Sequence, residues 1–328
     1  MLKPEAMVMH DRDIGEVKCP EAWSEIEKTG SFVQVNTHPV FYRRWGPLQQ
    51  QDNIVVLLHG IGDFSYRFEY LGTALGEAGW AVFAPDLYGR GHTPMADKSV
   101  KHDARCFIDL IHDFLLSLGV QSPVRILGHS MGGAIAAAYA ASYPSQVTAL
   151  ALLSPAGLMN PGPIPAIRFL CSCWWRSYCC FTCLKCAETP AQKIYRDDFH
   201  NPETAQLFPW YVAHQNLQRE NQPKQFEAFA AAVMAFPLFG LEPILLSLLD
   251  SGEWEAPVLL MWGANDNVIP TTDNFSRWKT ILEGSSKIQL TTKLVEDTSH
   301  CFFLEKVEES NGNILAWLGL PSSSSASR

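Results

Sequence analysis

The residues best suited to chemistry surround Ser130. Residues 128–132 read GHSMG, a G-x-S-x-G pentapeptide that follows an apolar run and precedes a stretch of small residues at 134–143. A sharp turn from strand to helix would hold the serine in a strained conformation, and Gly128 and Gly132 leave space where a Cβ would collide. The hydroxyl would then lie at the end of a sheet, beside a helix N-terminus that favours developing negative charge. The pattern predicts a nucleophilic serine.

A serine hydroxyl is a weak nucleophile at neutral pH, so it needs a base, and the base needs an orienting partner. Asp266 lies in the turn GANDN, directly after the apolar run 258–262. His300 follows the last strand-like run and precedes the final helical pattern. We therefore predict that Ser130 is the nucleophile, His300 the base and Asp266 the acid that orients it.

Each partner also has an ordinary interpretation. An Asp in such a turn usually only shapes the turn, and a His near a helix start usually caps it. Glu296 and Asp297 are competing acids beside His300, but they would need a different backbone path, and Asp273 falls within the following helix. The order of the three residues and their positions on loops after strands favour the catalytic interpretation.

Backbone amides are expected to form the oxyanion hole. One is that of Met131, directly after the nucleophile, and the second is that of Ile61, in the sequence LHGIGDF at 58–64. The glycines of this turn allow close approach of backbone to substrate. His59 is expected to support the turn by hydrogen bonding. A phosphate-binding loop is the alternative, but the glycine spacing and lysine of a P-loop are missing.

Apolar runs rich in β-formers alternate with helical patterns along the chain. This alternation predicts an α/β fold with a mostly parallel central sheet and helices on both faces. A hairpin, with strands at 32–35 and 40–45, leads into the sheet. The other expected strands are 54–58, 81–84, 124–127, 149–153, 258–262 and 288–295, and the expected helices are 64–78, 103–118, 131–143, 272–282 and 303–318.

The alternation stops between residues 157 and 254, where helical patterns and prolines replace strands. We interpret this part as an inserted helical cap over the carboxyl ends of the strands, where ligands bind in open α/β sheets. A second helical domain without contact to the site is the alternative. The expected organisation is an N-terminal extension (1–30), a core in two parts (31–156 and 255–320), the cap between them (157–254) and a Ser-rich disordered tail (321–328).

Taken together, these features resemble the α/β-hydrolase superfamily, in the capped branch that includes monoacylglycerol lipases, carboxylesterases and carbon–carbon bond hydrolases. The resemblance covers residues 30–320 and rests on HGIG at 59–62, DLYGRGHT at 86–93, WGAND at 262–266, and the order Ser, Asp, His. It implies the α/β-hydrolase fold and two-step acyl transfer with no metal or organic cofactor. The motif at 86–93 would be a structural turn. Ser130 distinguishes the chain from epoxide hydrolases and haloalkane dehalogenases, whose nucleophile is Asp.

Bulk properties exclude several classes of protein. The 328 residues are 47% apolar, and the net charge of −9 without a basic stripe argues against nucleic-acid partners. Residues 1–13 are too polar for a secretory signal, and no apolar run reaches the roughly 18 residues of a membrane span. We expect a cytoplasmic protein, either free or membrane-associated. Six of nine cysteines fall within 171–186, which favours reduced thiols over a disulfide framework.

The cysteine-rich segment leaves three interpretations open. It is a cap helix whose cysteines act as small apolar residues, or a membrane-contacting lid whose aromatic, basic and S-acylated side chains meet lipid, or a zinc site. The repeat at Cys180, Cys183 and Cys186 differs from the paired knuckles of structural zinc sites, and no histidine is close. Disulfides here would require an oxidising compartment.

These observations predict a serine hydrolase that acts on an apolar ester, such as a mono- or lysoglyceride-type lipid. A carbon–carbon bond hydrolase would use the same three residues and is the enzymatic alternative. A catalytically inactive lipid-binding protein is the third hypothesis, but its signature would be the loss of a catalytic residue, and all three are present.

Overall fold

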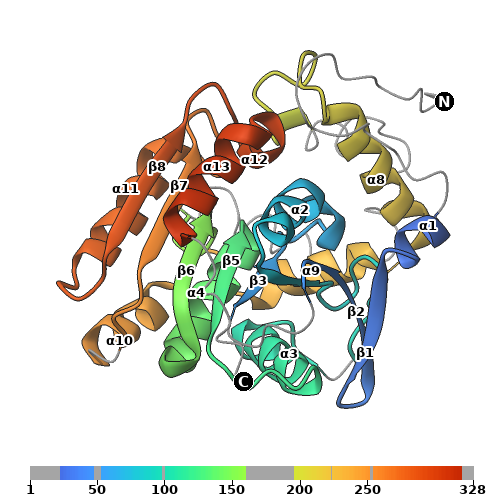
Figure 1. Ribbon diagram of the computed structural model, residues 1–328, viewed down its shortest axis with the longest axis horizontal. Coiled ribbons are helices and arrows are strands. Elements are labelled where there is room, and N and C mark those ends of the chain that lie inside the picture. Colours follow the sequence, from blue (N-terminus) through green and yellow to red (C-terminus); the bar gives the residue numbers. More distant parts are fainter. Residues whose placement is uncertain are drawn as a thin grey trace, which may run out of the picture.

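A computed structural model describes residues 23–47, 53–97, 100–159, 196–222, 224–251 and 254–319 of the chain. Its centre is an eight-stranded sheet with the order β1-β2-β4-β3-β5-β6-β7-β8 (Figure 1). β1 pairs antiparallel with β2, and β2 with β4, whereas the remaining pairs are parallel. The strands are β1 Gly30–Val35, β2 His38–Trp45, β3 Ile54–Leu58, β4 Ala81–Pro85, β5 Val124–His129, β6 Val147–Leu153, β7 Val258–Gly263 and β8 Leu290–Val295.

The central strands β3 and β7 are apolar, with a closing glycine in β7, because both of their faces are buried. All five residues of β3 are buried. Val56 and Leu58 join the core on one side of the sheet, whereas Val55 and Leu57 join the core on the other side. Successive side chains of a strand point to opposite faces, so a strand covered on both sides needs an apolar residue at each position. The predicted mostly parallel sheet is confirmed.

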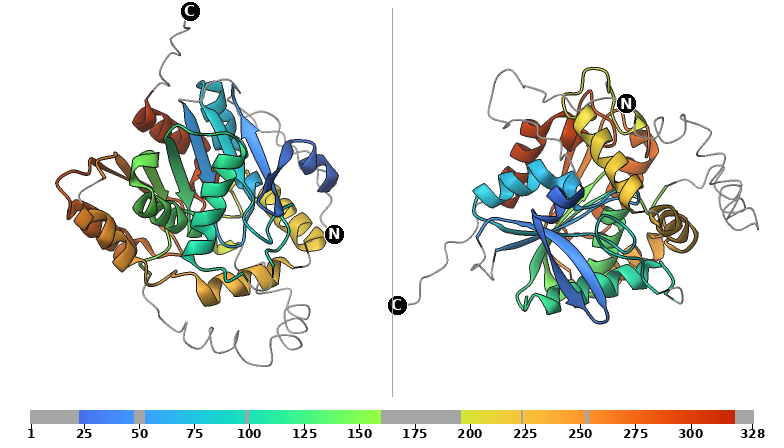
Figure 2. Two further views of the ribbon diagram at one scale, coloured as in Figure 1. Left: turned by 90° about the horizontal axis from the view of Figure 1, so that it is seen from below. Right: turned by 90° about the vertical axis from the view of Figure 1, so that its right-hand side faces the viewer.

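Helices cover both faces of this sheet (Figures 1 and 2). Buried residues of α3, α4, α10 and α11 belong to the core on one face, and those of α1, α2, α8, α12 and α13 to the core on the other. The helices are α1 Trp23–Glu27, α2 Glu69–Glu77, α3 Ala104–Ser117, α4 Met131–Ser142, α8 Phe208–Asn221, α9 Gln225–Ala235, α10 Glu242–Ser251, α11 Thr271–Glu283, α12 Phe302–Glu305 and α13 Val307–Leu318, with 3-10 turns η1 Ser65–Phe68 and η2 Pro144–Gln146.

Two predicted helices are each divided in the structure. The pattern at 64–78 forms η1 followed by α2, because the Ser65 amide donates to the Asp86 carboxylate at 2.6 Å and fixes the first turn to the loop after β4. The pattern at 303–318 forms α12 and α13, which are separated where Lys306 leaves the helical region with φ −126° and ψ 72°. Hydrophobic periodicity continues across both breaks, so the sequence alone did not reveal them.

The described residues between β6 and β7, at 196–222 and 224–251, form α8, α9 and α10, and these residues are called the cap below. Tyr211 of α8 packs into the core on the α2 side of the sheet, and Phe236, directly after α9, into the opposite core. The cap therefore packs against the cores on both faces of the sheet, beside the loops that follow the carboxyl ends of β3 and β6. The cysteine-rich segment, the Ser-rich tail and residues 1–22 of the expected N-terminal extension lie outside the described residues. Within the described part, no helix has the length and apolar character to cross a membrane.

Candidate active site

Ser130 lies in a sharp turn between β5 and α4. Its φ of 56° and ψ of −122° place it in a region that residues other than glycine rarely adopt. Backbone hydrogen bonds hold it there: the Ser130 amide donates to Leu153 O at 3.0 Å, and the Ala156 amide donates to Ser130 O at 2.9 Å. The neighbouring strand and the loop after it thus maintain the strained conformation. The structure places Ser130 in the type of turn that the sequence predicts.

The two glycines of the pentapeptide are required by close backbone contacts. A Cβ on Gly128 would lie 2.2 Å from the carbonyl oxygen of Gly132, and a Cβ on Gly132 would lie 2.0 Å from the carbonyl oxygen of Leu58. Both neighbours are backbone atoms, so they cannot move aside as a flexible side chain would. Only glycine fits at either position without a shift of the sheet or of α4.

Asp266 and His300 meet at the ends of β7 and β8. The Nδ1 atom of His300 lies 2.8 Å from Oδ2 of Asp266, and both side chains are buried. The other carboxylate oxygen, Oδ1, accepts from the amides of Val268 at 2.9 Å and Ile269 at 2.7 Å. Gly263 allows the two loops to approach, because its Cβ would lie 2.0 Å from Ser299 O. Backbone amides thus hold the carboxylate in place independently of its contact with the imidazole.

The competing acids lie elsewhere. Glu296, Asp297 and Asp273 are exposed, and the carboxylate of Asp297 lies 3.9 Å from the Lys306 ammonium. Of the acids that the sequence offers for His300, the structure brings Asp266 into hydrogen-bond contact.

The charge of Asp266 controls the titration of His300. Burial by itself lowers the pKa of His300, but the Asp266 carboxylate, through its charge and its hydrogen bond, raises it, and the net pKa lies above the ordinary value. A hydrogen bond to Asp266 also keeps the proton on Nδ1, so the neutral ring carries its lone pair on Nε2. This tautomer is the one that a general base for serine requires.

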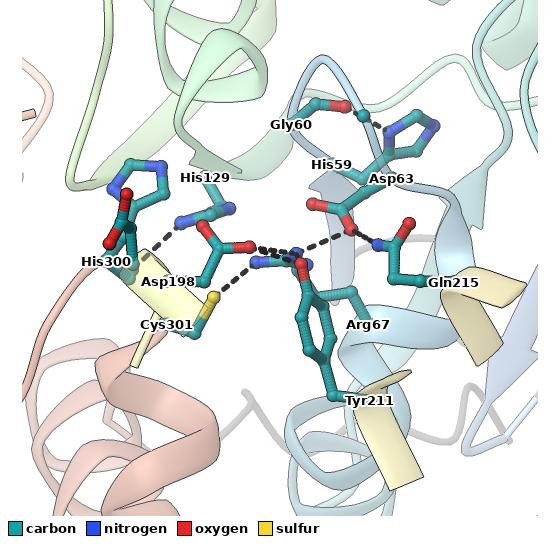
Figure 3. A network of polar contacts seen from close by, with 12 residues as sticks. His59, Gly60, Asp63, Arg67, His129, Asp198, Tyr211, Gln215, His300 and Cys301 are labelled. Atoms are coloured by element: carbon teal, nitrogen blue, oxygen red, sulfur yellow. Dashed lines mark hydrogen bonds and ion pairs between the residues drawn. The ribbon is translucent and has the colours of Figure 1, made fainter. Parts of the chain in front are cut away.

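His129, the residue before Ser130, contacts His300 directly (Figure 3). The two ring centroids are 4.5 Å apart, and Nε2 of His129 lies 3.1 Å from His300 O. Burial moves the pKa of His129 well below its ordinary value, so this ring is neutral and donates through Nε2 to the carbonyl. The contact joins the turn of Ser130 to the loop of His300.

The turn that follows β3 lies against Ser130. A Cβ on Gly60 would lie 3.2 Å from Cβ of Ser130. Ile61, the expected second oxyanion donor, is the next residue. Met131, the expected first donor, begins α4, so its amide has no carbonyl partner within the helix. The structure thus brings both predicted backbone donors to the end of the sheet where Ser130 lies.

His59 supports this turn in the way the sequence predicts. Its Nδ1 donates to Gly60 O at 2.8 Å, and its Nε2 accepts from the Leu87 amide at 3.0 Å. Burial lowers the pKa of His59 to about 3, so the ring stays neutral. His59 therefore links the turns after β3 and β4 without carrying a charge.

The motif at 86–93 forms a tight turn beneath the site. The buried Asp86 carboxylate accepts from the amides of Ser65 at 2.6 Å and His92 at 2.9 Å. Burial raises the pKa of Asp86 to about 6. Gly91 has a φ of 51°, and its Cβ would lie 2.0 Å from the Asp86 carboxylate. The contacts are those of a structural turn, as the resemblance implied.

Sequence reasoning missed a buried charged cluster beside His300, centred on Arg67 (Figure 3). Arg67 donates to Asp63 at 2.6 Å and to the Cys301 sulfur at 2.7 Å, and Asp198 lies 3.8 Å away. Burial lowers the pKa of Arg67, but neighbouring groups, first among them the Asp63 carboxylate, raise it, and the net pKa lies above the ordinary value. The Cys301 amide also donates to Asp198 O at 2.8 Å, which links the loop of His300 to the cap.

The only sequence signal for this cluster was the i, i+4 spacing of Asp63 and Arg67, which usually marks a solvated surface pair. Among the described residues, no group of three or more His, Cys, Asp or Glu side chains is arranged to hold a metal ion. The cysteines considered for zinc, at 180, 183 and 186, lie outside these residues.

Comparison with known proteins links this architecture to a large group of enzymes. Residues 49–204 match the model of the family described as serine aminopeptidase, S33. The chain is 33% identical over 143 residues to a monoacylglycerol lipase of Mycolicibacterium smegmatis, and the match covers 42% of this chain and 50% of that protein. It is 32% identical over 141 residues to the human monoglyceride lipase, covering 42% of this chain and 46% of that protein. The matched part thus spans about half the length of these relatives.

A longer match and solved structures extend the likeness across the cap. Lipase 1 of Psychrobacter immobilis is 27% identical over 276 residues, which cover 80% of this chain and 76% of that protein. The enol-lactonase structure from Burkholderia xenovorans superposes with a TM-score of 0.68 at 16% identity, covering 88% of this chain and 99% of that one. A 2-hydroxy-6-oxo-6-phenylhexa-2,4-dienoate hydrolase from Rhodococcus gives a TM-score of 0.68 at 18% identity, with coverage of 88% and 98%. The sheet order and the solved structures show that the chain has the α/β-hydrolase fold, and its matched part is similar to monoglyceride lipases and to the serine aminopeptidase, S33, family.

Proposed function

We propose that the protein is a serine hydrolase that cleaves carboxylic esters with an apolar acyl chain through an acyl-enzyme intermediate. The observation that carries the proposal is the 2.8 Å hydrogen bond between His300 and Asp266, on a loop that contacts the turn of Ser130 through His129. A serine, an imidazole oriented by a hydrogen bond and a buried carboxylate are the three groups that serine acyl transfer needs.

In the proposed first step, Nε2 of His300 takes the Ser130 proton as Oγ attacks the ester carbonyl carbon. The carbonyl oxygen becomes an oxyanion and accepts hydrogen bonds from the amides of Met131 and Ile61. The tetrahedral intermediate collapses, the alcohol leaves with the proton from His300, and the acyl group stays on Ser130. Water, deprotonated by His300, then releases the carboxylic acid, and Asp266 stabilises the imidazolium in both steps.

The proposal of an apolar substrate rests on the relatives and on the composition of the cap. Monoglyceride lipases and a bacterial lipase are among the similar proteins. In the cap, the backbones of Leu238 and Leu241 form hydrogen bonds with the backbone of Gly157, in the segment that follows β6. The neighbouring residue Ala156 donates its amide to Ser130 O. Both leucine side chains are buried there. Apolar side chains of the cap thus pack close to the turn of Ser130, and a monoacylglycerol or lysolipid is the substrate class that these relatives suggest.

The test is hydrolysis by the full chain of monooleoylglycerol and of p-nitrophenyl esters from acetyl to palmitoyl. We expect cleavage that favours the longer acyl chains, and loss of about a millionfold in kcat for Ser130→Ala, as is typical when a serine nucleophile is removed. Ser154→Ala is the matched control, because Ser154 is also buried, also has a positive φ of 43° and also follows a strand of the sheet. It should keep full activity.

Other outcomes would favour the alternatives. Cleavage of a vinylogous diketone, but not of any ester, would identify a carbon–carbon bond hydrolase that uses the same three residues. Tight binding of lipid without turnover would identify an inactive lipid-binding protein. Membrane contact through the cysteine-rich segment at 171–186 stays a prediction from the sequence, and sedimentation with phosphatidylserine vesicles would test it.

A further inference from the structure

The cap holds the turn that carries Ile61. Three consecutive carbonyl groups of this turn are each bound by a different side chain. Gly60 O accepts from His59 Nδ1 at 2.8 Å, Ile61 O from Arg90 Nε at 2.7 Å, and Gly62 O from Gln218 Nε2 at 3.0 Å. His59 belongs to the turn itself and Arg90 to the loop after β4, whereas Gln218 lies on α8.

These bonds fix the direction of the Ile61 amide. A trans peptide unit is planar, so its C=O and N–H groups point in opposite directions, and the Gly60 carbonyl sets the aim of the Ile61 N–H. Gly62 O and the Asp63 N–H are related in the same way. The Asp63 amide donates back to Gly60 O at 3.3 Å and closes the turn. A change in the Gly62–Asp63 peptide would therefore disturb the peptide that contains the Ile61 N–H.

Gly62 needs an external partner to hold this geometry. Gly62 is exposed, and a Cβ added to it would meet no heavy atom within 4 Å, so no packing on that side restrains it. Gln218 supplies the restraint. Its side chain is fully buried, and its Oε1 accepts from the Gly91 amide at 2.9 Å while Nε2 donates to Gly62 O. Both ends of the amide are thus fixed.

Arg90, on the loop after β4, provides a second link between the turn and the cap. Besides Ile61 O, its guanidinium reaches Tyr88 O at 2.7 Å and Ala228 O of α9 at 3.1 Å. The turn is therefore bound to both α8 and α9.

Gln222, one helical turn after Gln218, provides an internal comparison. Its Nε2 donates to Gly91 O at 3.2 Å and Thr93 O at 3.3 Å. Gln222 therefore holds the C-terminal end of α8 to the 86–93 turn, but it has no contact with the turn of Ile61 in these hydrogen bonds.

We propose that Gln218 is a positioning residue for the oxyanion hole: the Ile61 N–H is aimed at the reacting oxygen only while α8 lies on the turn and Gln218 binds Gly62 O. This inference rests on the proposed ester hydrolase function. It makes the cap a component of transition-state stabilisation as well as a cover for the substrate.

The test compares kcat/KM for an oxoester and for the matching thionoester, whose sulfur is a poor hydrogen-bond acceptor in the tetrahedral intermediate. Loss of one oxyanion donor costs about 10²–10³ in rate, so we expect a misaimed donor in Gln218→Met to lower kcat/KM for the oxoester about tenfold. The thionoester rate should change little, so the ratio of the two rates falls about tenfold. The matched variant Gln222→Met should keep the wild-type ratio.

Gln218→Glu and Gln218→Leu give independent variants should the Met side chain prevent folding. A Glu carboxyl at this buried position would still be protonated at pH 8 and could donate to Gly62 O as Gln does, so Gln218→Glu should keep most of the ratio and thereby show that the donor is what matters. Gln218→Leu, which has no donor, should lower the ratio, and Gln222→Leu should keep it. Equal losses for both substrates in Gln218→Met and Gln218→Leu, or an unchanged ratio in these two variants, would overturn the inference while leaving the proposed function intact. A wild-type protein that cleaves neither ester, or a Ser130→Ala variant that cleaves both, would instead contradict the proposed function.

Discussion

The Nδ1 atom of His300 lies 2.8 Å from Oδ2 of Asp266, although 34 positions separate the two residues along the chain. The contact forms because β7 and β8 run parallel and their carboxyl ends meet at one edge of the sheet. Gly263 has no side chain, and a Cβ at this position would keep the two loops apart. An acid and an imidazole on neighbouring loops are thus joined by the topology of the sheet.

Asp266→Asn should reduce kcat by about 10⁴, because the amide no longer holds the Nδ1 proton and the base loses its productive tautomer. The variant should fold, since its shape is unchanged. Asp297→Asn is the matched control, because this acid is close to His300 in sequence but is exposed. Ester hydrolysis by the two variants would decide between the acids, and a larger loss in Asp297→Asn would contradict the assignment.

The pH profile should report the raised pKa of His300. The base acts only when neutral, so kcat/KM should fall as the pH decreases through a pKa above the ordinary histidine value. In Asp266→Asn the carboxylate no longer offsets burial, so the acid limb should move to lower pH. Measurement of kcat/KM against pH with a neutral ester checks both statements. An acid limb at the same pH in the two proteins would show that Asp266 does not control the titrating group.

Gly132→Ala should damage both stability and activity. The new Cβ would lie 2.0 Å from Leu58 O, and overpacking of this kind costs about 1–3 kcal/mol. A displacement of the Ser130 turn should reduce kcat on the order of 10²-fold. Gly312→Ala, in α13, is the control: its Cβ would meet no atom within 4 Å, and it should stabilise the fold by about 0.4–1 kcal/mol. Urea unfolding and ester hydrolysis measure the two effects, and wild-type stability of Gly132→Ala would refute the crowding argument.

Arg67→Met should destabilise the protein by about 3–5 kcal/mol, because it leaves Asp63 and Asp198 buried without their cation. Arg105→Met removes an exposed partner of Asp109, at the same i, i+4 spacing, and should leave the unfolding midpoint unchanged. Denaturant titration of both variants gives the comparison. Equal stability of the two would mean that the Arg67 cluster does not hold the cap to the core.

Most of the sheet and the candidate residues could be predicted from local patterns. The runs at 54–58 and 258–262 are apolar at each position, and such runs form strands covered on both sides. Ser130 and Asp266 could be proposed because each follows an apolar strand, and His300 because it follows the last strand, β8. Residues after parallel strands gather at one edge of the sheet. Gly128 and Gly132 indicated the tight turn from the sequence alone, because no larger residue fits at either position.

The contacts between the cap and the core could not be predicted in this way. Gln218 binds Gly62 O, a residue 156 positions earlier, and glutamines in helices are ordinarily solvated. Arg67 and Asp198 meet only because α8 and the loop before it pack on the α2 side of the sheet. Such pairings depend on the relative placement of elements, and sequence periodicity does not contain that information.

The most direct measurement is covalent labelling of the full chain by a fluorophosphonate, with the adduct located by peptide mass spectrometry. We expect one adduct per chain on Ser130, labelling abolished in Ser130→Ala and strongly slowed in His300→Ala, and wild-type labelling in Ser154→Ala. An unlabelled but folded wild-type protein, or an adduct on a residue other than Ser130, would contradict the assignment of Ser130 as an activated nucleophile.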